Sequence, residues 1–345
     1  MSLEGLNRRI KTTSDLGEIV STMKMLSSVS VTQYERALKA LTQYAYTIQD
    51  AFHGLFTQDF FHYTPPKIPK TNTKILAIII GSDNGLVGRF NRDLMAYVQR
   101  YIHKNYPDST LQVMAVGKRI GLLANIQKLH IQGTNPISNS LKEIAPMAAQ
   151  FLNQINDIVS HHKIDTVYIF FNRKQDTSAF VPQARQIIPL PDDQLQKLQK
   201  NKWNGRTLPL ITADKHELFS ALIREYLILI LSHTLVSSLV SEHYTRMIHM
   251  QEAENNIKES LEEFNLQYQQ LRQTQITDEL IDIVSGAEEM NKQKNQTPLD
   301  FTKKNVKMSS IKSSNTCLGT KTAQNRRAQR KVGKVTSTYR KGHVA

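Results

Sequence analysis

A hydrophobic repeat in the last third of the 345-residue chain constrains the fold more than any other feature. Alternate steps of four and three residues from Leu222 reach sixteen positions, of which twelve are apolar. A heptad repeat of this length predicts a left-handed coiled coil. No Pro or Gly interrupts residues 215–285, so the segment predicts one helix on the order of 110 Å long that must project from any compact domain. The positions are Leu222, Tyr226, Leu229, His233, Val236, Val240, His243, Met247, Met250, Glu254, Ile257, Leu261, Phe264, Tyr268, Leu271 and Gln275.

The N-terminal segment carries a second heptad pattern, with ten of twelve positions apolar when Ala and Tyr are counted. Two such helices at opposite ends of a chain predict an antiparallel coiled coil, because the residues between them leave and return at one end. The alternative is two independent amphipathic helices packed on a globular core. Leu3, Leu6 and Ile10 lie one residue out of phase and predict a slip near residues 14–17. The positions are Leu16, Val20, Met23, Ser27, Ser30, Tyr34, Ala37, Leu41, Tyr44, Ile48, Ala51 and Leu55.

Between the two helices, short apolar runs alternate with helical stretches. This alternation predicts a small α/β domain with a mainly parallel sheet. The predicted buried strands are residues 74–81, 111–117 and 166–171, and the predicted helices are residues 89–103 and 141–162. A Pro-rich linker is predicted over residues 62–74, an edge strand over residues 180–191 because of its prolines, and a loop over residues 192–204.

The charge of the chain is concentrated in its last 55 residues. Residues 291–345 hold 14 Lys and Arg against one acid, so they account for +13 of the formal net charge of +14. The basic composition therefore gives no reason to regard the rest of the chain as a nucleic-acid binder. The segment is poor in large apolar residues and is predicted to be disordered. Cys317 is the single cysteine, which excludes a disulfide framework and fits a reducing compartment.

No signal for catalysis or for a bound cofactor stands out. The turn at residues 81–90 (GSDNGLVGRF) lies where α/β sheets often bind phosphate, but its glycines do not have the dinucleotide spacing. Lys118 and Arg119 stand where an acid would meet a ribose. His161 and His162 are adjacent on a helix and rarely hold one ion. We therefore predict no cofactor, no metal and no catalytic residue. The apolar stretch at residues 226–241 is shorter than the roughly 20 residues a bilayer needs.

The end of the long helix has a distinctive pattern. A polar belt at residues 272–279 is followed by an apolar tip at residues 280–287. A polar belt alone is often a solvated face, but an apolar tip on a projecting helix would aggregate unless something covers it. This arrangement predicts a partner around the tip.

Four segments together resemble the gamma subunit of F-type ATP synthases. The opening RRIKTTSDLGEIVSTMKMLSSVS is similar to the first helix of that family, and the turn GSDNGLVGRFN resembles its SDRGLCGxxN. SEHYTRMIHMQEAENNI, from Ser241, resembles SEHxxRMxAMxxATxNA, and ITDELIDIVSGAEEM, from Ile276, resembles ITxELxEIVxGAxA. The segments occur in the family's order and cover residues 1 to about 290.

The resemblance implies an α/β plus coiled-coil fold. Long N- and C-terminal helices form an antiparallel coiled coil, and a Rossmann-like α/β domain without cofactor is inserted between them. The expected divisions are a helix at 1–58, a linker at 59–73, the α/β domain at 74–210, the second helix at 211–290 and a basic tail at 291–345.

The resemblance also implies a central-stalk rotor that is not an enzyme on its own. The coiled coil would enter a ring of three alpha and three beta subunits, and the α/β domain would lie with the epsilon subunit on the ring of c subunits. Rotation driven by protons or sodium ions would change the affinities of the catalytic sites in turn. The expected location is peripheral, on the cytoplasmic face of a bacterial inner membrane.

The resemblance implies partner contacts for six residues. One lies near the region where a beta-subunit loop meets the shaft, and the others lie in or near the polar belt. The arginines would donate the strongest hydrogen bonds to an acidic loop. These residues are Met23, Arg246, Arg272, Gln273, Thr277 and Glu279.

The tail departs from the family, which usually ends near Met290. Its charge fits an acidic stator surface, lipid headgroups or nucleic acid. The alternative function is therefore a coiled-coil nucleic-acid-binding protein that acts through this tail, with salt-sensitive binding lost on deletion of residues 291–345. A nucleotide-dependent α/β enzyme would need a phosphate loop that the sequence does not show.

Overall fold

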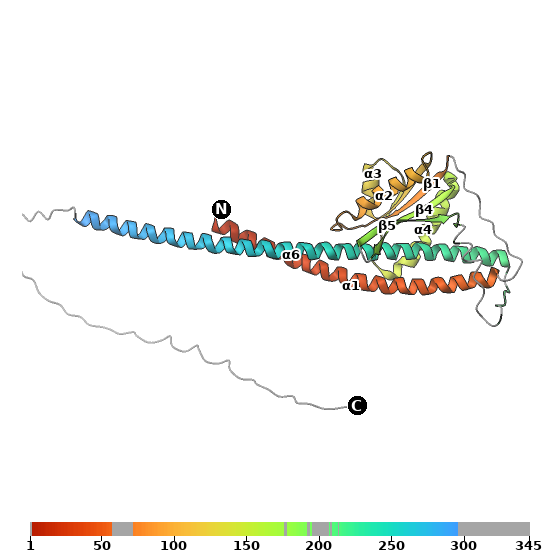
Figure 1. Cartoon of the computed structure of the whole chain (residues 1–345), viewed down its shortest axis with the longest axis horizontal. Coiled ribbons are helices and arrows are strands. Elements are labelled where there is room, and N and C mark those ends of the chain that lie inside the picture. The colour runs from red at the N-terminus through yellow and green to blue at the C-terminus, as the bar shows by residue number, and fades with distance from the viewer. Residues whose placement is uncertain are drawn as a thin grey trace, which may run out of the picture. The chain divides into compact units, whose positions relative to one another are not determined.

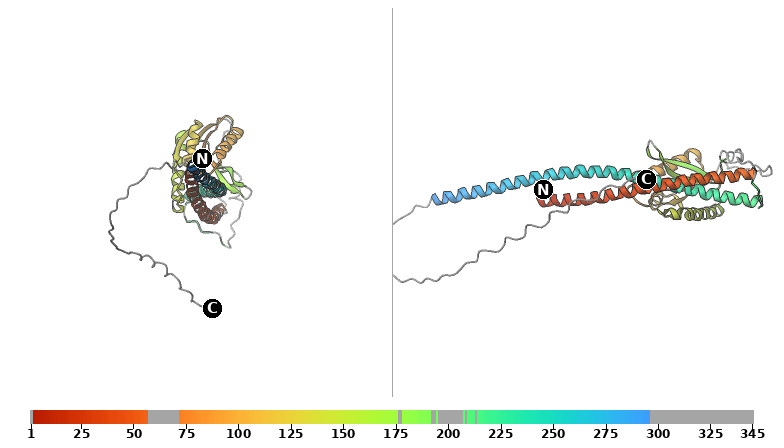
Figure 2. Two further views of the ribbon diagram at one scale, coloured as in Figure 1. Left: turned by 90° about the vertical axis from the view of Figure 1, so that its left-hand side faces the viewer. Right: turned by 90° about the horizontal axis from the view of Figure 1, so that it is seen from below.

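Two long helices, α1 (Leu3–Phe56) and α6 (Lys215–Asn295), dominate the computed structural model. The model describes residues 2–56, 72–175, 178–191, 194, 207, 209–212 and 214–295. The chain divides into two units, one up to Ile281 and one from Asp282, and the fold described below is that of the first. Within it, α1 and α6 lie side by side in each view (Figures 1 and 2).

The two helices run antiparallel, as predicted. Residues that come later in α1 contact residues that come earlier in α6, through an ion pair, a hydrogen bond and ring contacts. The pairs are Lys24–Glu254, Tyr34–His243, Tyr44–Glu225 and Phe52–Phe219. This pairing confirms the antiparallel coiled coil and contradicts the alternative of two independent helices.

The seam of α1 agrees with the predicted one at eight of its twelve positions and differs at Leu16, Met23, Tyr44 and Ala51, which are exposed. The less exposed positions recur at steps of three and four residues from the start of the helix, and they include Gly17 and Lys24 rather than Leu16 and Met23. A Cβ on Gly17 would lie 3.2 Å from Cγ2 of Ile257, so the glycine lets α6 approach closely. The predicted slip near residues 14–17 was therefore wrong, because a count of apolar residues favoured the larger side chains over the residues that meet α6.

On α6 the predicted seam is confirmed as far as Leu271. Met250 is buried, and the later seam positions are half-buried among neighbours that are mostly exposed. Gln275, the next position, is exposed. The half-buried seam positions are Glu254, Ile257, Leu261, Phe264, Tyr268 and Leu271.

Between the helices lies a five-stranded sheet in the order β3-β2-β1-β4-β5. All neighbouring strands are parallel except β4 and β5. The strands are β1 (Lys74–Ile80), β2 (Thr110–Val116), β3 (His130–Asn135), β4 (Thr166–Gln175) and β5 (Ser178–Ile188). The predicted strands and the predicted edge strand correspond to four of these. β3 and the helix α3 (Lys118–Ile126) were not predicted.

Each face of the sheet is covered by helices, and the alternation along β1 sets the two faces. Ile75, Ala77 and Ile79 pack with α2 (Phe90–Asn105) and α3. The intervening side chains of β1, Leu76 and Ile78 among them, pack with α4 (Leu141–His162), α1 and α6. The first part of α6 is thus core for the α/β domain as well as partner for α1.

Burial explains the apolar stretch of α6. By length and composition alone, α6 is the one helix among the described residues that could cross a membrane, with a mean hydropathy of 1.5 over its most apolar window. A core helix meets the same criterion, and residues 226–241 are mostly buried against the sheet and α1.

Candidate functional site

The crevice at the carboxyl ends of β1 and β4, where α/β folds bind ligands, is occupied by α6. The strand order reverses direction between β1 and β4, which makes this place the switch point of the sheet. Ser238 Oγ donates a hydrogen bond to the Ile80 carbonyl at 3.3 Å. Ser241 Oγ lies 3.0 Å from the Asn172 carbonyl and 2.9 Å from the Ser237 carbonyl of its own helix, so the two carbonyls share its one hydrogen. Both serines are buried. The helix α6 therefore lies against β1 and β4 at this place.

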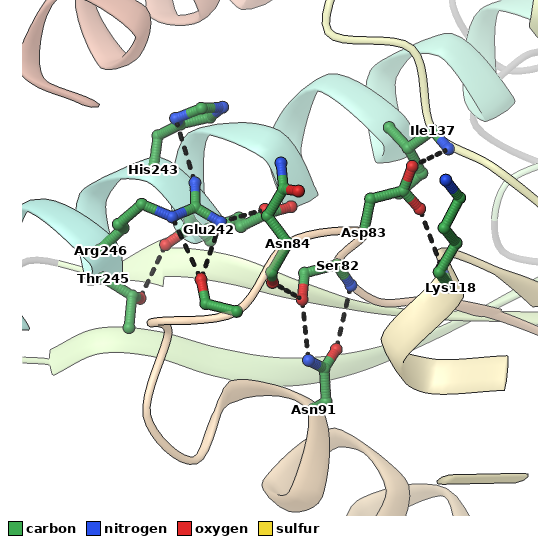
Figure 3. A network of polar contacts seen from close by, with 12 residues as sticks. Ser82, Asp83, Asn84, Asn91, Lys118, Ile137, Glu242, His243, Thr245 and Arg246 are labelled. Atoms are coloured by element: carbon green, nitrogen blue, oxygen red, sulfur yellow. Dashed lines mark hydrogen bonds and ion pairs between the residues drawn. The ribbon is translucent and has the colours of Figure 1, made fainter. Parts of the chain in front are cut away.

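The glycine turn that follows β1 satisfies its own polar groups (Figure 3). The Asp83 carboxylate accepts hydrogen bonds from the backbone N–H of Lys118, the first residue of α3, at 2.8 Å and from that of Ile137 at 3.2 Å. A phosphate could use such a helix N-terminus, but here a side-chain carboxylate takes it. Asn91 of α2 exchanges two hydrogen bonds with Ser82, at 3.0 and 2.8 Å.

Arg246 joins this turn to α6. Its Nη2 lies 2.6 Å from Oε1 of Glu242, and its Nε and Nη2 each donate to the Gly85 carbonyl at 3.4 Å. Its Nη1 lies 3.4 Å from Nδ1 of His243 (Figure 3). Arg246 is 7% exposed and Glu242 is 4% exposed, so the ion pair belongs to the interior.

Burial changes the protonation of this cluster. Removal from water raises the pKa of Glu242 to about 7, and this effect outweighs the favourable charge of Arg246. Removal from water, helped by the same guanidinium, lowers the pKa of His243 to about 4. Nε2 of His243 is buried without a hydrogen-bond partner among the described residues. The two neighbouring groups are therefore shifted so that each favours its uncharged form.

The structure separates Arg246 from the other predicted contact residues. The sequence grouped it with the exposed polar belt, but its guanidinium is directed into the domain. In this chain it bonds to Glu242 and to the glycine turn, and its predicted role as a donor to a partner's acidic loop stays a prediction.

The other predicted contact residues are accessible. Met23 is 36% exposed, and every side chain from Arg272 to Met290 is exposed. Thr277 Oγ1 donates to the Gln273 carbonyl at 2.8 Å, and Glu279 Oε1 accepts from Gln275 Nε2 at 3.1 Å. These local hydrogen bonds leave the outer face of the belt open to solvent.

Large apolar side chains are also exposed on both helices. On α1 they follow one face, and a groove of about 510 Å³ lined in part by Met25, Val29, Met247 and Ile248 lies beside it. Sequence reasoning missed this face of α1, although its spacing of three and four residues was visible once Gly17 and Lys24 were placed on the seam. The exposed apolar residues of this face of α1 are Leu16, Ile19, Met23, Met25, Leu26 and Val29, and those of the α6 tip are Leu280, Ile281, Ile283 and Val284.

Among the described residues, no group of three His, Cys, Asp or Glu side chains lies close enough to hold a metal ion. The site therefore consists of a filled crevice and of exposed helix surfaces.

Comparisons with known proteins agree with this description. Residues 2–290 match a family described as ATP synthase. The ATP synthase gamma chain of Geotalea daltonii is 27% identical over 290 residues, which cover 83% of this chain and 98% of the relative. The gamma chain from Staphylococcus aureus is 26% identical with the same coverage. A chain in the cryo-EM structure of the Euglena gracilis mitochondrial ATP synthase OSCP/F1/c-ring has the same fold, with a TM-score of 0.57 at 18% identity over 87% of this chain and 98% of that one.

The fold defines a class of stalk protein. In this class an antiparallel helix pair carries an α/β domain, and one of the two helices packs at the place where related domains bind a ligand. This chain belongs to the ATP synthase gamma-chain family, the central-stalk rotor subunits of F-type ATP synthases. The nucleic-acid-binding alternative finds no support in these relatives, and the tail on which it depends lies outside the described residues.

Proposed function

We propose that this chain couples ion-driven rotation to catalysis on other subunits and is not itself catalytic. The α1–α6 pair turns inside a ring of three alpha and three beta subunits, and the α/β domain binds the epsilon subunit and the ring of c subunits. The complex lies on the cytoplasmic face of a bacterial inner membrane, and its ion is the proton or sodium. Bacterial relatives that carry the gamma-chain name support this location.

The exposed end of α6 carries this proposal. Leu280, Ile281 and Val284 are each more than half exposed, and they follow the polar belt in the sequence. Monomeric proteins rarely leave so much apolar surface in water, because it drives association. A sleeve of other subunits would cover the apolar tip and the exposed face of α1 while leaving the helices free to turn.

Five accessible residues are proposed to contact the beta subunits. Arg272 offers a planar set of donors that fits a carboxylate, which makes it the strongest candidate. The free faces of the other side chains supply weaker hydrogen bonds or apolar contact. The residues are Met23, Arg272, Gln273, Thr277 and Glu279.

Two experiments test the function. Purification through a tagged alpha subunit is expected to bring beta, epsilon and this chain together, and absence of this chain would contradict the rotor role. The Arg272→Ala/Gln273→Ala variant is expected to lower ion-driven ATP synthesis in membrane vesicles without loss of assembly. Glu259→Ala/Glu262→Ala, also two exposed side chains of α6, is the matched control and is expected to retain synthesis. Equal rates in the two variants would count against the contact residues.

A further inference from the structure

One face of α6 bonds to the α/β domain over three helical turns. Ser238 and Ser241 donate to strand-end carbonyls, and Arg246 donates to the glycine turn. His249 lies directly against the same turn, since a Cβ on Gly88 would stand 2.3 Å from its Nε2. At 3.6 residues per turn these four positions share one side of the helix. We call Ser238, Ser241, Arg246 and His249 the α6 seat.

The seat differs in kind from the apolar packing around it. Apolar contact is non-directional, so the core fixes the angle of α6 through the shapes of the packed side chains. A hydrogen bond weakens steeply as its angle departs from linear, and the carbonyls of Ile80, Gly85 and Asn172 are fixed by the strands and the turn. A twist of α6 about its own axis must therefore distort the seat as well as the apolar packing.

The same stretch of α6 is bonded to α1 on another side. The His243 ring lies 5.4 Å from that of Tyr34, and Gln251 accepts a hydrogen bond from Lys24 at 3.2 Å. A force that enters α6 from the domain through the seat thus reaches α1 within a few residues, without passing along the length of either helix.

We propose that the α6 seat is the joint that transmits torque between the α/β domain and the α1–α6 pair. This inference rests on the proposed rotor function. It assigns the torsional stiffness between the α/β domain and α6 to four side chains. In related architectures this part of the sheet binds nucleotides, whereas here it would hold α6 against rotation.

The test measures angular stiffness in the rotary complex with its alpha and beta subunits. The ring is fixed to a surface, and a rod is attached through a Lys104→Cys substitution in α2 of a Cys317→Ser chain. The Ser238→Ala/Ser241→Ala variant removes two of the four hydrogen bonds from the seat to sheet and turn carbonyls. Alanine is smaller and favours helix, so the fold is retained. The angular variance during catalytic pauses is expected to rise about twofold, because half of the directional contacts are lost.

Two further variants separate the joint from a general effect on stability. Thr234→Val removes a fully buried hydroxyl of α6 that bonds only to the carbonyls of its own helix, Ile230 and Leu231, and is expected to leave the variance unchanged. Arg246→Lys keeps a positive charge beside Glu242 but loses the planar fork that reaches Gly85, and is expected to raise the variance.

The outcomes are distinct. The proposal that the α6 seat transmits torque would be overturned by an unchanged angular variance in both Ser238→Ala/Ser241→Ala and Arg246→Lys. An equal rise of the angular variance in Thr234→Val would also overturn it. A raised angular variance in the seat variants, in a complex that rotates with an unaltered rate of ATP hydrolysis, supports the proposal. A wild-type complex that shows no rotation would overturn the rotor function itself.

Discussion

The two ends of α6 belong to one helix but differ in burial. Around residues 226–246 most side chains are buried, and several of the polar ones bond to the sheet, the glycine turn or carbonyls of the helix itself. From Arg272 to Met290 every side chain is exposed, including several large apolar ones. One uninterrupted helix runs through both ends, although the heptad seam stops at Leu271, so the helix continues where its packing does not. Internal contacts fix the first end, and the second end is shaped for a partner outside this chain.

Removal of one charge from the buried end of α6 is expected to change the stability of the chain most. Glu242→Ala is expected to lower the free energy of unfolding by about 3–5 kcal/mol, because it leaves the buried Arg246 guanidinium, which cannot lose its proton, without its carboxylate. Urea or thermal unfolding followed by circular dichroism measures the change. Glu279→Ala at the exposed end is the control, and is expected to stay within about 0.5 kcal/mol of the wild type. Similar losses in the two variants would mean that the ends do not differ as described.

A matched pair of glycines sharpens the same contrast. A Cβ on Gly81 would stand 2.5 Å from Cβ of Ile120 and 2.6 Å from Oδ1 of Asn91, so Gly81→Ala is expected to cost about 1–3 kcal/mol through overpacking. Gly286 has no heavy atom within 4 Å of the same position. Gly286→Ala is therefore expected to raise helix stability by up to about 1 kcal/mol. A thermal midpoint unchanged by Gly81→Ala would contradict the close packing of the turn.

The long-period features of this fold were predictable from the sequence. The α6 seam was predicted correctly as far as Leu271, and the apolar strands were predicted as well. A repeated pattern is a reliable signal because many residues contribute to it. Strand β3 was missed since four of the six residues in its sequence, HIQGTN, are polar, and alternate residues are exposed. The first part of the α1 seam was misplaced at Leu16 and Met23, because Gly17 and Lys24 meet α6 through close approach and charge rather than through apolar bulk.

The candidate site was predictable only at its exposed end. A polar belt followed by an apolar tip is a local pattern, so the accessibility of Arg272 and its neighbours could be anticipated. The burial of Arg246 could not, because its carbonyl partner Gly85 lies 161 residues away in sequence. The filling of the crevice by Ser238 and Ser241 depends in the same way on contacts distant in sequence that no spacing encodes.

A dependence of stability on pH tests the buried end by itself. The pKa of Glu242 is raised from 4.5 to about 7, so between these values the folded chain binds more protons than the unfolded one. Its contribution to stability therefore grows as the pH falls from 7 toward 4.5. The pKa of His243 is lowered from 6.5 to about 4, so its contribution decreases as the pH falls from 6.5 toward 4.

The two contributions oppose each other between pH 6.5 and 4.5, each with a slope of at most about 1.4 kcal/mol per pH unit. Single substitutions are expected to expose them one at a time. Relative to the wild type, Glu242→Gln should lose stability as the pH falls through this range, because the His243 contribution remains alone. His243→Gln should gain stability over the same range. Differences between variants cancel the titration of surface carboxylates, so urea midpoints at pH 6.5, 5.5 and 4.5 suffice. Parallel curves for the two variants would show that this pair does not titrate as a buried cluster, and the contrast between the two ends of α6 would then rest on packing alone.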